Sequence, residues 1–197
     1  MLKTRDMQPH LFGIDTVLLT NRTVTRRFRE GDGAAFFDLL QDNSAVLGDE
    51  FAELLEEASD KERAEAYVRC TLSDWLLHKQ FIFGIWDNKS ARQIGLMGFL
   101  HPDWSVPKAE LTCFIHRDYT RKGIMTECLT ALLRFGFQQL LLEKIYVQTA
   151  MDNYPAQRLV RKCGFRREGD LRFERKKPTG EYVDVMLLAL TRQETGY

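Results

Sequence analysis

A polar turn between an apolar strand and a long amphipathic helix is the feature that most constrains this chain. Residues 109–116 have the composition of a strand, and the turn Asp-Tyr-Thr-Arg-Lys-Gly follows at residues 118–123. From Ile124 to about Leu142, apolar residues recur at the spacing of one helix face. We therefore expect a sheet with a helix packed on it, and this strand–turn–helix unit at its centre.

The turn also has the chemistry of a phosphate site. The start of a helix directs unpaired N–H groups and the positive end of the helix dipole at one point, which favours phosphate. Arg121 and Lys122 supply cations, Gly123 permits close approach of the backbone, and Thr126 offers a hydroxyl. Many strand-to-helix turns carry a glycine beside solvated charges, so the turn alone favours phosphate binding and an ordinary surface turn about equally.

The segments before this unit alternate between strand and helix patterns. A strand is predicted at residues 23–28, a helix from residue 34, and strands at 81–86 and 94–100 joined by a hairpin turn. Residues 50–80 predict two helices divided near Ser59, whose spacing to Glu62 fits a capping box. Residues 1–20 form a polar leader.

The segments after this unit continue in the same way. A strand is predicted at residues 145–149, a short helix at 155–162 that ends before Gly164, and strands at 171–175 and 182–190. No repeat or linker divides the chain, so residues 1–197 predict a single domain.

Charge and cysteine spacing exclude several classes of protein. The 28 basic and 28 acidic side chains cancel, which gives no global reason to bind nucleic acid or an anionic membrane. The four cysteines lie far apart, so no metal site is expected, and they are typical of a reduced, cytoplasmic protein. No stretch is long and apolar enough to cross a bilayer.

Several motifs in unbroken order resemble the RimJ/RimL-type branch of the GNAT N-acetyltransferases. They are Ala109-Glu110-Leu111, the turn through Gly123 to Glu127, Asp152-Asn153, Lys162-Cys163-Gly164-Phe165 with the following Glu168-Gly169, and Tyr182-Val183-Asp184-Val185. With the strand and helix between Asn21 and Asn43, the resemblance covers roughly residues 20–192.

The resemblance implies an α+β chain with the GNAT, or acyl-CoA N-acyltransferase, fold. Its mixed, mainly antiparallel sheet of six to seven strands is splayed near the middle and flanked by helices. Residues 109–165 form the acyl-CoA-binding core, and the helical segment 33–80 forms the acceptor side. Loops around Asp103-Trp104 and from Phe173 to Tyr182 complete the acceptor side, where Trp104 and Tyr182 are expected to wall a pocket.

Acetyl-CoA is the implied co-substrate, without a metal. The residues that the resemblance assigns to acyl-CoA binding are Cys113, Phe114, Ile115, Arg121, Lys122, Gly123, Ile124, Met125, Thr126, Asn153 and Arg158. The backbone of residues 112–115 is expected to pair with the pantetheine arm as an added strand would. Asn153 is expected to hydrogen-bond that arm, or to cap the helix before Pro155, or both.

Two positions depart from the family pattern. The turn usually reads Arg/Gln-x-x-Gly-x-Gly/Ala, whereas Asp118, Arg121 and Gly123 occupy those positions here. Arg121 therefore replaces a glycine, which implies either backbone strain at a positive φ or an ordinary φ and an added cation. Ala156 stands where RimL-like members carry a serine, so a proposed acid for the leaving thiolate is missing.

Two catalytic residues are predicted. Glu110, beside the expected thioester, is the candidate general base, directly or through a water, and an ordinary strand-end glutamate is the alternative. Tyr154 is the candidate proton donor to the CoA sulfur, although a turn tyrosine more often packs its ring. Cys113 and Cys163 are interpreted as packing residues. His116 is a further candidate base, although a lone histidine at a strand end is more often a solvated or hydrogen-bonded side chain.

The predicted function is N-acetyl transfer to a primary amine, most favourably a protein or peptide N-terminus. A small-molecule amine such as a polyamine or an antibiotic-like compound is the alternative acceptor, and Glu50, Glu53, Glu56 and Glu57 would suit a cation. A catalytically silent acyl-CoA-binding module is a further alternative, and a nucleic-acid-binding domain a remote one. A homodimer paired through the strand at 183–190 is also possible.

Overall fold

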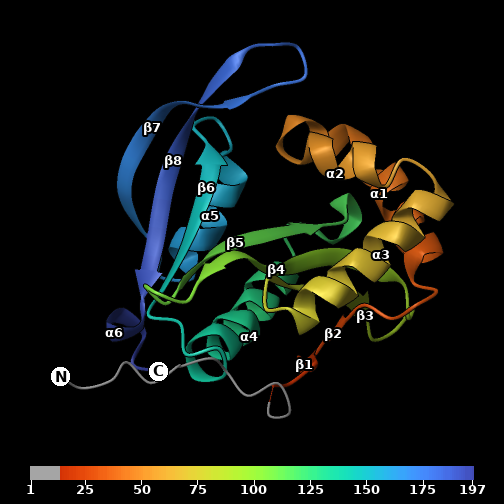
Figure 1. Cartoon of the computed structure of the whole chain (residues 1–197), viewed down its shortest axis with the longest axis horizontal. Helices are drawn as coiled ribbons and strands as arrows, with labels where there is room; N and C mark the ends of the chain where they lie inside the picture. The colour runs from red at the N-terminus through yellow and green to blue at the C-terminus, as the bar shows by residue number, and fades with distance from the viewer. Residues whose placement is uncertain (1–13) are drawn as a thin grey trace.

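A computed structural model describes residues 14–197, and one eight-stranded sheet runs through them (Figure 1). The strand order is β1-β2-β3-β4-β5-β6-β8-β7. The strands are β1 (Val17–Leu19), β2 (Thr23–Arg27), β3 (Gln80–Asp87), β4 (Gln93–Asp103), β5 (Lys108–Ile115), β6 (Lys144–Ala150), β7 (Arg166–Lys176) and β8 (Tyr182–Thr191).

Seven of these strands match the predicted ones, and β1 is the addition. Most of the predicted polar leader, residues 1–13, lies outside the described residues, but β1 lies within its last part and pairs with β2. Leu18 is buried, which explains why this short segment joins the sheet.

The sheet is antiparallel except between β5 and β6, and there it splays. The two strands pair only through Lys108–Glu110 and Lys144–Tyr146. Beyond these pairs β5 runs on to Ile115 and β6 to Ala150 without pairing between the two strands. The predicted splay is therefore present, and each strand has a stretch of edge that faces it.

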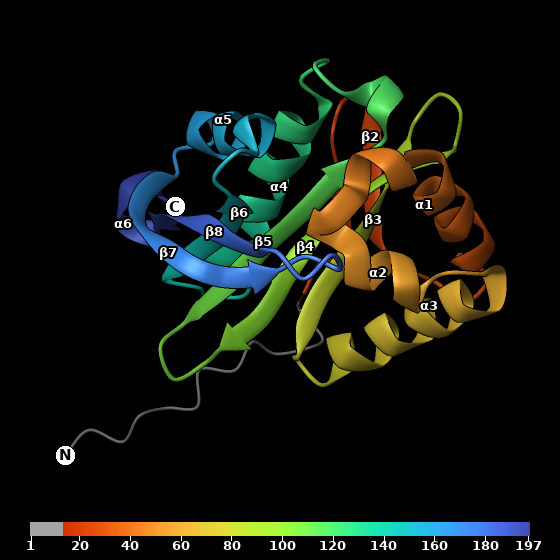
Figure 2. The same ribbon diagram turned by 90° about the horizontal axis from the view of Figure 1, so that it is seen from above.

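The helices cover both faces of the sheet. They are α1 (Gly33–Leu47), the 3-10 turn η2 (Gly48–Phe51), α2 (Ala52–Glu57), α3 (Lys61–Leu76), the 3-10 turn η3 (Arg117–Tyr119), α4 (Ile124–Gln138), α5 (Tyr154–Lys162) and α6 (Arg192–Thr195). Figure 2 shows α4 and α5 on one side of the sheet and α2 and α3 on the other.

Because successive side chains of a strand point to opposite faces of the sheet, the core is divided into two clusters, one on each face. Phe83 and Phe99 pack in the cluster that includes α4, whereas Ile82, Leu96 and Phe114 pack in the cluster that includes α1. Because side chains alternate along β5, the neighbours of Phe114 at even positions, including Glu110, point to the α1 side. We call this face of the sheet the acceptor face and the α4 side the donor face.

Two helix boundaries differ from the predicted ones. Helix α4 ends at Gln138 instead of about Leu142, because the Leu142 N–H bonds back to the Gly136 carbonyl around Leu141 at a φ of +56°. Helix α3 is capped by Asp60, whose carboxylate accepts the Arg63 N–H at 2.8 Å, so the predicted Ser59 capping box is wrong by one residue.

The expected dimer edge is not available. Strand β8 lies between β6 and β7, and residues 185–189 pair on both sides, so the strand at 183–190 has no open ladder to offer a second copy. Within residues 14–197, no helix is long and apolar enough to span a membrane, and no group of three His, Cys, Asp or Glu side chains is placed to hold a metal ion.

Candidate active site

The polar turn at the end of β5 contains two left-handed positions, Arg121 and Gly123, with Lys122 between them. Arg121 has a φ of +58°, and Gly123, the N-cap of α4, has a φ of +75°. The strained alternative for Arg121 is therefore the one observed, at a cost of about 1–2 kcal/mol relative to glycine. Within the described residues, the N–H groups of residues 123–126 have no acceptor, as a phosphate-binding helix start requires.

Two of the predicted cationic side chains lie in this turn, and a third lies on a helix that contacts α4. Arg121 and Lys122 are exposed in the turn, and Arg158 is exposed on the first half of α5, which contacts α4. The Lys122 ammonium lies 5.4 Å from the centre of the Tyr119 ring. The turn is thus open to solvent and carries positive charge where the N–H groups converge.

An ion pair that sequence reasoning missed holds the turn against β2. Arg22 donates to the Lys122 carbonyl at 2.7 Å and pairs with Glu127 at 2.7 Å, and the Asn21 N–H donates to the same carboxylate. Burial alone would raise the pKa of Glu127, but the hydrogen bonds from Arg22, Thr20 and Asn21 outweigh it and lower that pKa. Glu127 is therefore charged at neutral pH and anchors the turn.

His116 fixes the other end of the turn. Its Nδ1 accepts the Asp118 N–H at 3.1 Å, and its own backbone N–H donates to Ile94 on β4 at 2.7 Å. Burial, followed by the charge of Arg92, lowers the pKa of His116, so the imidazole is neutral at pH 7. The expected hydrogen-bonded role is the one observed.

The edge of β5 that faces the splay is free. Because the His116 N–H points to β4 and the pairing is regular, Phe114 and Thr112 also direct their backbone groups to β4. Cys113 and Ile115 then direct theirs into the splay, where an extended ligand can pair with them. The Phe114 ring lies on the acceptor face, 5.2 Å from the Phe51 ring.

The surroundings of Cys113 disfavour the thiolate form of its side chain. It is half-buried against the donor-face core, and burial raises the pKa of its thiol to about 12. Burial likewise raises the pKa of Cys163. Both observations agree with their interpretation as packing residues.

Glu110 lies at the vertex of the splay. It forms the last pair with β6, opposite Tyr146, and its side chain on the acceptor face is 18% exposed. His101 Nδ1 lies 3.4 Å from its Oε2. Burial and then the charges of Glu110 and Asp103 raise the pKa of Tyr146, a neighbour that sequence reasoning did not identify. A carboxylate thus stands where the free edge of β5 begins.

Asn153 caps α5, as one of its two expected roles requires. Its Oδ1 accepts the Ala156 N–H at 3.2 Å, and its Nδ2 lies 3.3 Å from Glu50 Oε1. Tyr154, the next residue, is 62% exposed. Asn153 is therefore oriented by the protein, whereas the Tyr154 side chain projects into solvent.

The structure does not bring Trp104 and Tyr182 together. The Trp104 ring packs 6.0 Å from His78 and 6.2 Å from Phe81, whereas Tyr182 packs 5.4 Å from Phe173 on the β7–β8 hairpin. The two rings thus have separate aromatic partners, on different elements. Phe173 and Tyr182 are the exposed aromatic pair on the hairpin.

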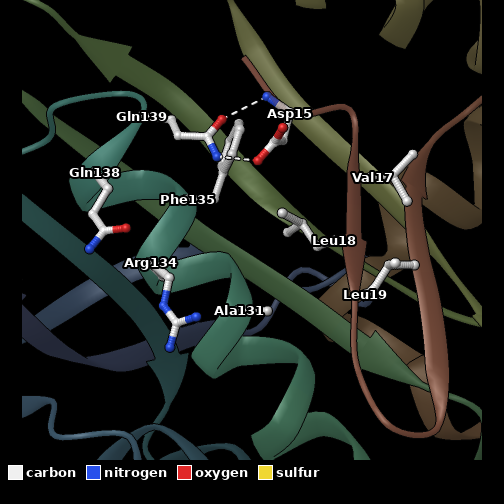
Figure 3. A pocket seen from close by; sticks show the side chains of 9 residues that line it. All are labelled: Asp15, Val17, Leu18, Leu19, Ala131, Arg134, Phe135, Gln138 and Gln139. Carbon is white, nitrogen blue, oxygen red and sulfur yellow. Dashed lines mark hydrogen bonds between the residues drawn. The ribbon is translucent and has the colours of Figure 1, made fainter. Parts of the chain in front are cut away.

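A separate hollow of about 200 Å³ lies between β1 and α4 (Figure 3). Leu18 and Phe135 line it, and Asp15 and Gln139 close one end with two hydrogen bonds of 2.6 Å. It contains none of the predicted site residues, so the splay and not this hollow is the candidate site.

The free β5 edge, the open helix start and the cations fit an extended ligand that ends in a diphosphate, as acyl-CoA does. The family model described as "Acetyltransferase (GNAT) domain" matches residues 22–166. The chain therefore belongs to the GNAT family of acetyl-CoA-dependent N-acetyltransferases. Its α+β fold with a splayed, mainly antiparallel sheet is the fold that the sequence predicted.

Three curated N-acetyltransferases are similar to this chain in sequence. An uncharacterized N-acetyltransferase p20 of Bacillus licheniformis is 30% identical over 57% of this chain, which spans only 62% of that relative. A putative ribosomal N-acetyltransferase of Bacillus subtilis is 24% identical over 88% of this chain and 94% of its own. A spermidine N(1)-acetyltransferase of Vibrio cholerae is 33% identical over 47% of this chain and 53% of its own.

Solved structures show the same fold. RimJ of Mycobacterium smegmatis, in complex with a CoA disulfide, superposes with a TM-score of 0.84 at 19% identity over 97% of this chain and 93% of its own. RimL, a ribosomal L7/L12 alpha-N-protein acetyltransferase in complex with coenzyme A, superposes with a TM-score of 0.81 at 17% identity over 89% and 97%.

Proposed function

We propose that this protein transfers an acetyl group from acetyl-CoA to the N-terminal amine of a protein or peptide in the cytoplasm. The observation that carries the proposal is that three features follow one another along β5 and the turn after it. These are the open N–H groups at the start of α4, the free edge of β5, and the Glu110 carboxylate at the vertex of the splay. A donor bound along this path presents its acyl end beside a candidate base.

The chain's own residues have separate tasks in this proposal. Residues 121–126 hold the diphosphate, and Cys113 and Ile115 pair through their backbones with the pantetheine arm, while acetyl-CoA supplies the acetyl group as a thioester. Glu110 accepts a proton from the amine, directly or through a water. An α-amine with a pKa near about 8 needs less help than a lysine amine near about 10.4, so one carboxylate suffices for an N-terminus.

The leaving sulfur has one candidate proton donor. Tyr154 follows Asn153 at the start of α5, and its hydroxyl is exposed. We assign it the task of protonating the thiolate, in place of the serine for which Ala156 stands. Because a thiolate is already fairly stable near neutral pH, loss of this hydroxyl should slow turnover without abolishing it.

The fold likeness to RimJ and RimL supports a ribosomal-protein type of acceptor. The spermidine acetyltransferase relative supports a polyamine as the second candidate, and Glu53, Glu56 and Glu57 are exposed on α2, where they suit a cation. Glu50 no longer belongs to that set because it is paired with Arg175.

Calorimetric titration of acetyl-CoA and CoA into the purified protein tests the donor site. We expect dissociation constants in the range of roughly 1 μM to 1 mM, by analogy with ordinary substrate affinities. Arg121→Glu should weaken binding by about 10- to 100-fold, because one charge-assisted contact is replaced by repulsion. Arg121→Met is the matched control, since it keeps the same backbone strain without the charge, and its loss should be smaller.

Acetyl transfer to a panel of N-terminal peptides and to spermidine then identifies the acceptor. Faster transfer to peptides than to spermidine would support the proposal, and the reverse would favour the polyamine candidate. Steady CoA binding without transfer to any amine would make the protein a silent acyl-CoA-binding module. Absence of CoA binding by the wild type would overturn the proposed activity altogether.

A further inference from the structure

The two edges that face the splay differ, because that of β6 is occupied. The Met151 N–H donates to the backbone carbonyl of Asp184, near the start of β8. Because backbone groups alternate in direction along a strand, those of Ala150 and Gln148 point away from β8 and into the splay. In contrast to Cys113 and Ile115 on β5, three of these four backbone groups have side-chain partners. The Gln148 carbonyl and the Ala150 N–H bond to side chains from distant parts of the chain, and the Ala150 carbonyl accepts from Gln157 Nε2 at 3.1 Å.

Two charged side chains hold the β6 edge. Arg175 of β7 donates Nη2 to the Gln148 carbonyl at 2.7 Å, and Glu50 of η2 accepts the Ala150 N–H at 3.1 Å. Arg175 Nη1 also donates to Glu50 Oε2, so the two side chains are joined to each other. Figure 1 shows α2, which follows η2, facing the β7–β8 hairpin across the splay. We call this arrangement of Glu50, Arg175 and the β6 edge the clasp.

The clasp also orients Asn153. Glu50 Oε1 lies 3.3 Å from Asn153 Nδ2, while Asn153 Oδ1 accepts the Ala156 N–H. Both ends of the amide are therefore engaged, which fixes its plane, and the second hydrogen of Nδ2 remains available for a ligand. Because the Glu50 side chain is only 25% exposed and its oxygens are shared among three donors, it is poorly placed to attract a cationic acceptor.

We propose that Glu50 and Arg175 are positioning residues that seal the β6 edge and orient Asn153, so that the pantetheine arm pairs with β5 alone. This inference rests on the proposed function. With Gln148 and Ala150 engaged, β5 offers the free backbone edge, so the pantetheine arm can pair with the sheet in one register. Without the clasp, the backbone edge of β6 would compete with β5 for the arm, and the Asn153 side chain would be free to rotate.

The test compares two ligands that share the nucleotide part of CoA. CoA contains the pantetheine arm, whereas adenosine 3′,5′-bisphosphate lacks it and needs only the turn at residues 121–126. We expect Glu50→Ala to weaken CoA about 10-fold by calorimetry and to change bisphosphate binding less than about 2-fold. A 10-fold change in the dissociation constant corresponds to about 1.4 kcal/mol, which is the size of the contribution of about one hydrogen bond.

Two further variants sharpen the test. Glu50→Gln keeps an oxygen that can accept from Ala150 and Asn153, so it should retain most of the CoA affinity. Glu62→Ala removes an exposed carboxylate from the nearby helix α3, and it should leave the binding of both ligands unchanged. Together they separate the loss of the clasp from the loss of a charge.

Three outcomes would overturn the positioning role. Equal losses for CoA and the bisphosphate would show general damage to the site, and tighter CoA binding by Glu50→Ala would show that the clasp competes with the arm. Unchanged CoA binding would show that the clasp is irrelevant to the donor. In each case wild-type CoA binding stands and the proposed function survives, whereas a wild type that binds neither ligand would defeat both proposals.

Discussion

The donor half and the acceptor half of the site are built in opposite ways. The donor half, residues 108–138, is one continuous stretch in which β5, its turn and α4 follow each other along the chain. The proposed acceptor half combines the helical segment 33–80 with the loops around Asp103-Trp104 and from Phe173 to Tyr182, and an ion pair beside it joins Glu50 to Arg175, which are 125 residues apart. A unit whose parts are adjacent in the chain can be recognised from the spacing of its residues, whereas a contact between distant segments produces no such spacing.

The boundary between the halves is Glu110, and its substitution should have the largest effect. Glu110→Gln removes the candidate base without changing the side-chain size, so kcat should fall about 100-fold, within the usual contribution of general base catalysis. Affinity for CoA should stay the same. Steady-state kinetics with a peptide acceptor, together with calorimetry, provide the measurement.

The pH dependence supplies the control for Glu110. If Glu110 serves to deprotonate the amine, the deficit of Glu110→Gln should shrink as the pH rises past the amine pKa of about 8. A constant deficit across pH would assign Glu110 a structural part, and a wild-type kcat in the variant would exclude it as the base.

The hairpin aromatics test whether the acceptor half acts independently of the donor half. Phe173 and Tyr182 are 70% and 57% exposed, although their rings pack against each other, and Phe173 has a φ of +55°. Phe173→Ala combined with Tyr182→Ala should raise the KM of a peptide acceptor about 5- to 10-fold, since each ring offers apolar area to the acceptor. Leu19→Ala, an exposed apolar residue on β1, is the control. A parallel loss of CoA affinity would contradict the separation of the halves.

His116 gives the smallest expected effect, on stability within the donor half. Its folded-state pKa is lowered below the ordinary value of about 6.5 by burial and by Arg92, with Arg117 acting in the same sense and Asp118 and Asp42 opposing. The unfolded chain therefore binds a proton first, and stability falls as the pH drops below about 6.5.

Urea unfolding between pH 7.5 and pH 5 measures this effect. His116→Asn cannot titrate and keeps an oxygen for the Asp118 N–H, so its unfolding free energy should depend less on pH over this interval than that of the wild type. Identical slopes for the two proteins would assign the pH dependence to other groups.

Most of the fold was predictable because its elements have strong local signals. Seven strands, the splay and the helix at residue 124 follow from apolar periodicity and family motifs, and the missed elements, β1 and the terminal helix α6, are only three and four residues long. The start of the helix after Asp60 was misplaced by one residue, because Ser and Asp are both favoured N-cap residues. Which of the two caps the helix depends on the direction of the backbone before it.

The candidate site was predictable in part for the same reason. Gly123 and Asn153 could be placed from their motifs, and their geometry is a left-handed N-cap and an oriented helix cap. Arg22, Tyr146 and Arg175 could not, because each acts on residues from another strand or loop and no spacing along the chain marks it. The aromatic partners of Trp104, His78 and Phe81, could not be predicted because an aromatic side chain in a loop gives no indication of which part of the core it joins.

The sequence by itself therefore determined the elements and the donor half, since hydrophobic period, capping and turn chemistry act between near neighbours. Only the tertiary structure decided which strand edges face the splay and which of them is closed. Which edge is free depends on the register of β5 and β6. It also depends on the side chains of η2 and β7 that reach across the splay to the β6 edge. Backbone hydrogen bonding is directional, so one residue of register decides whether a polar group faces a neighbouring strand or a ligand.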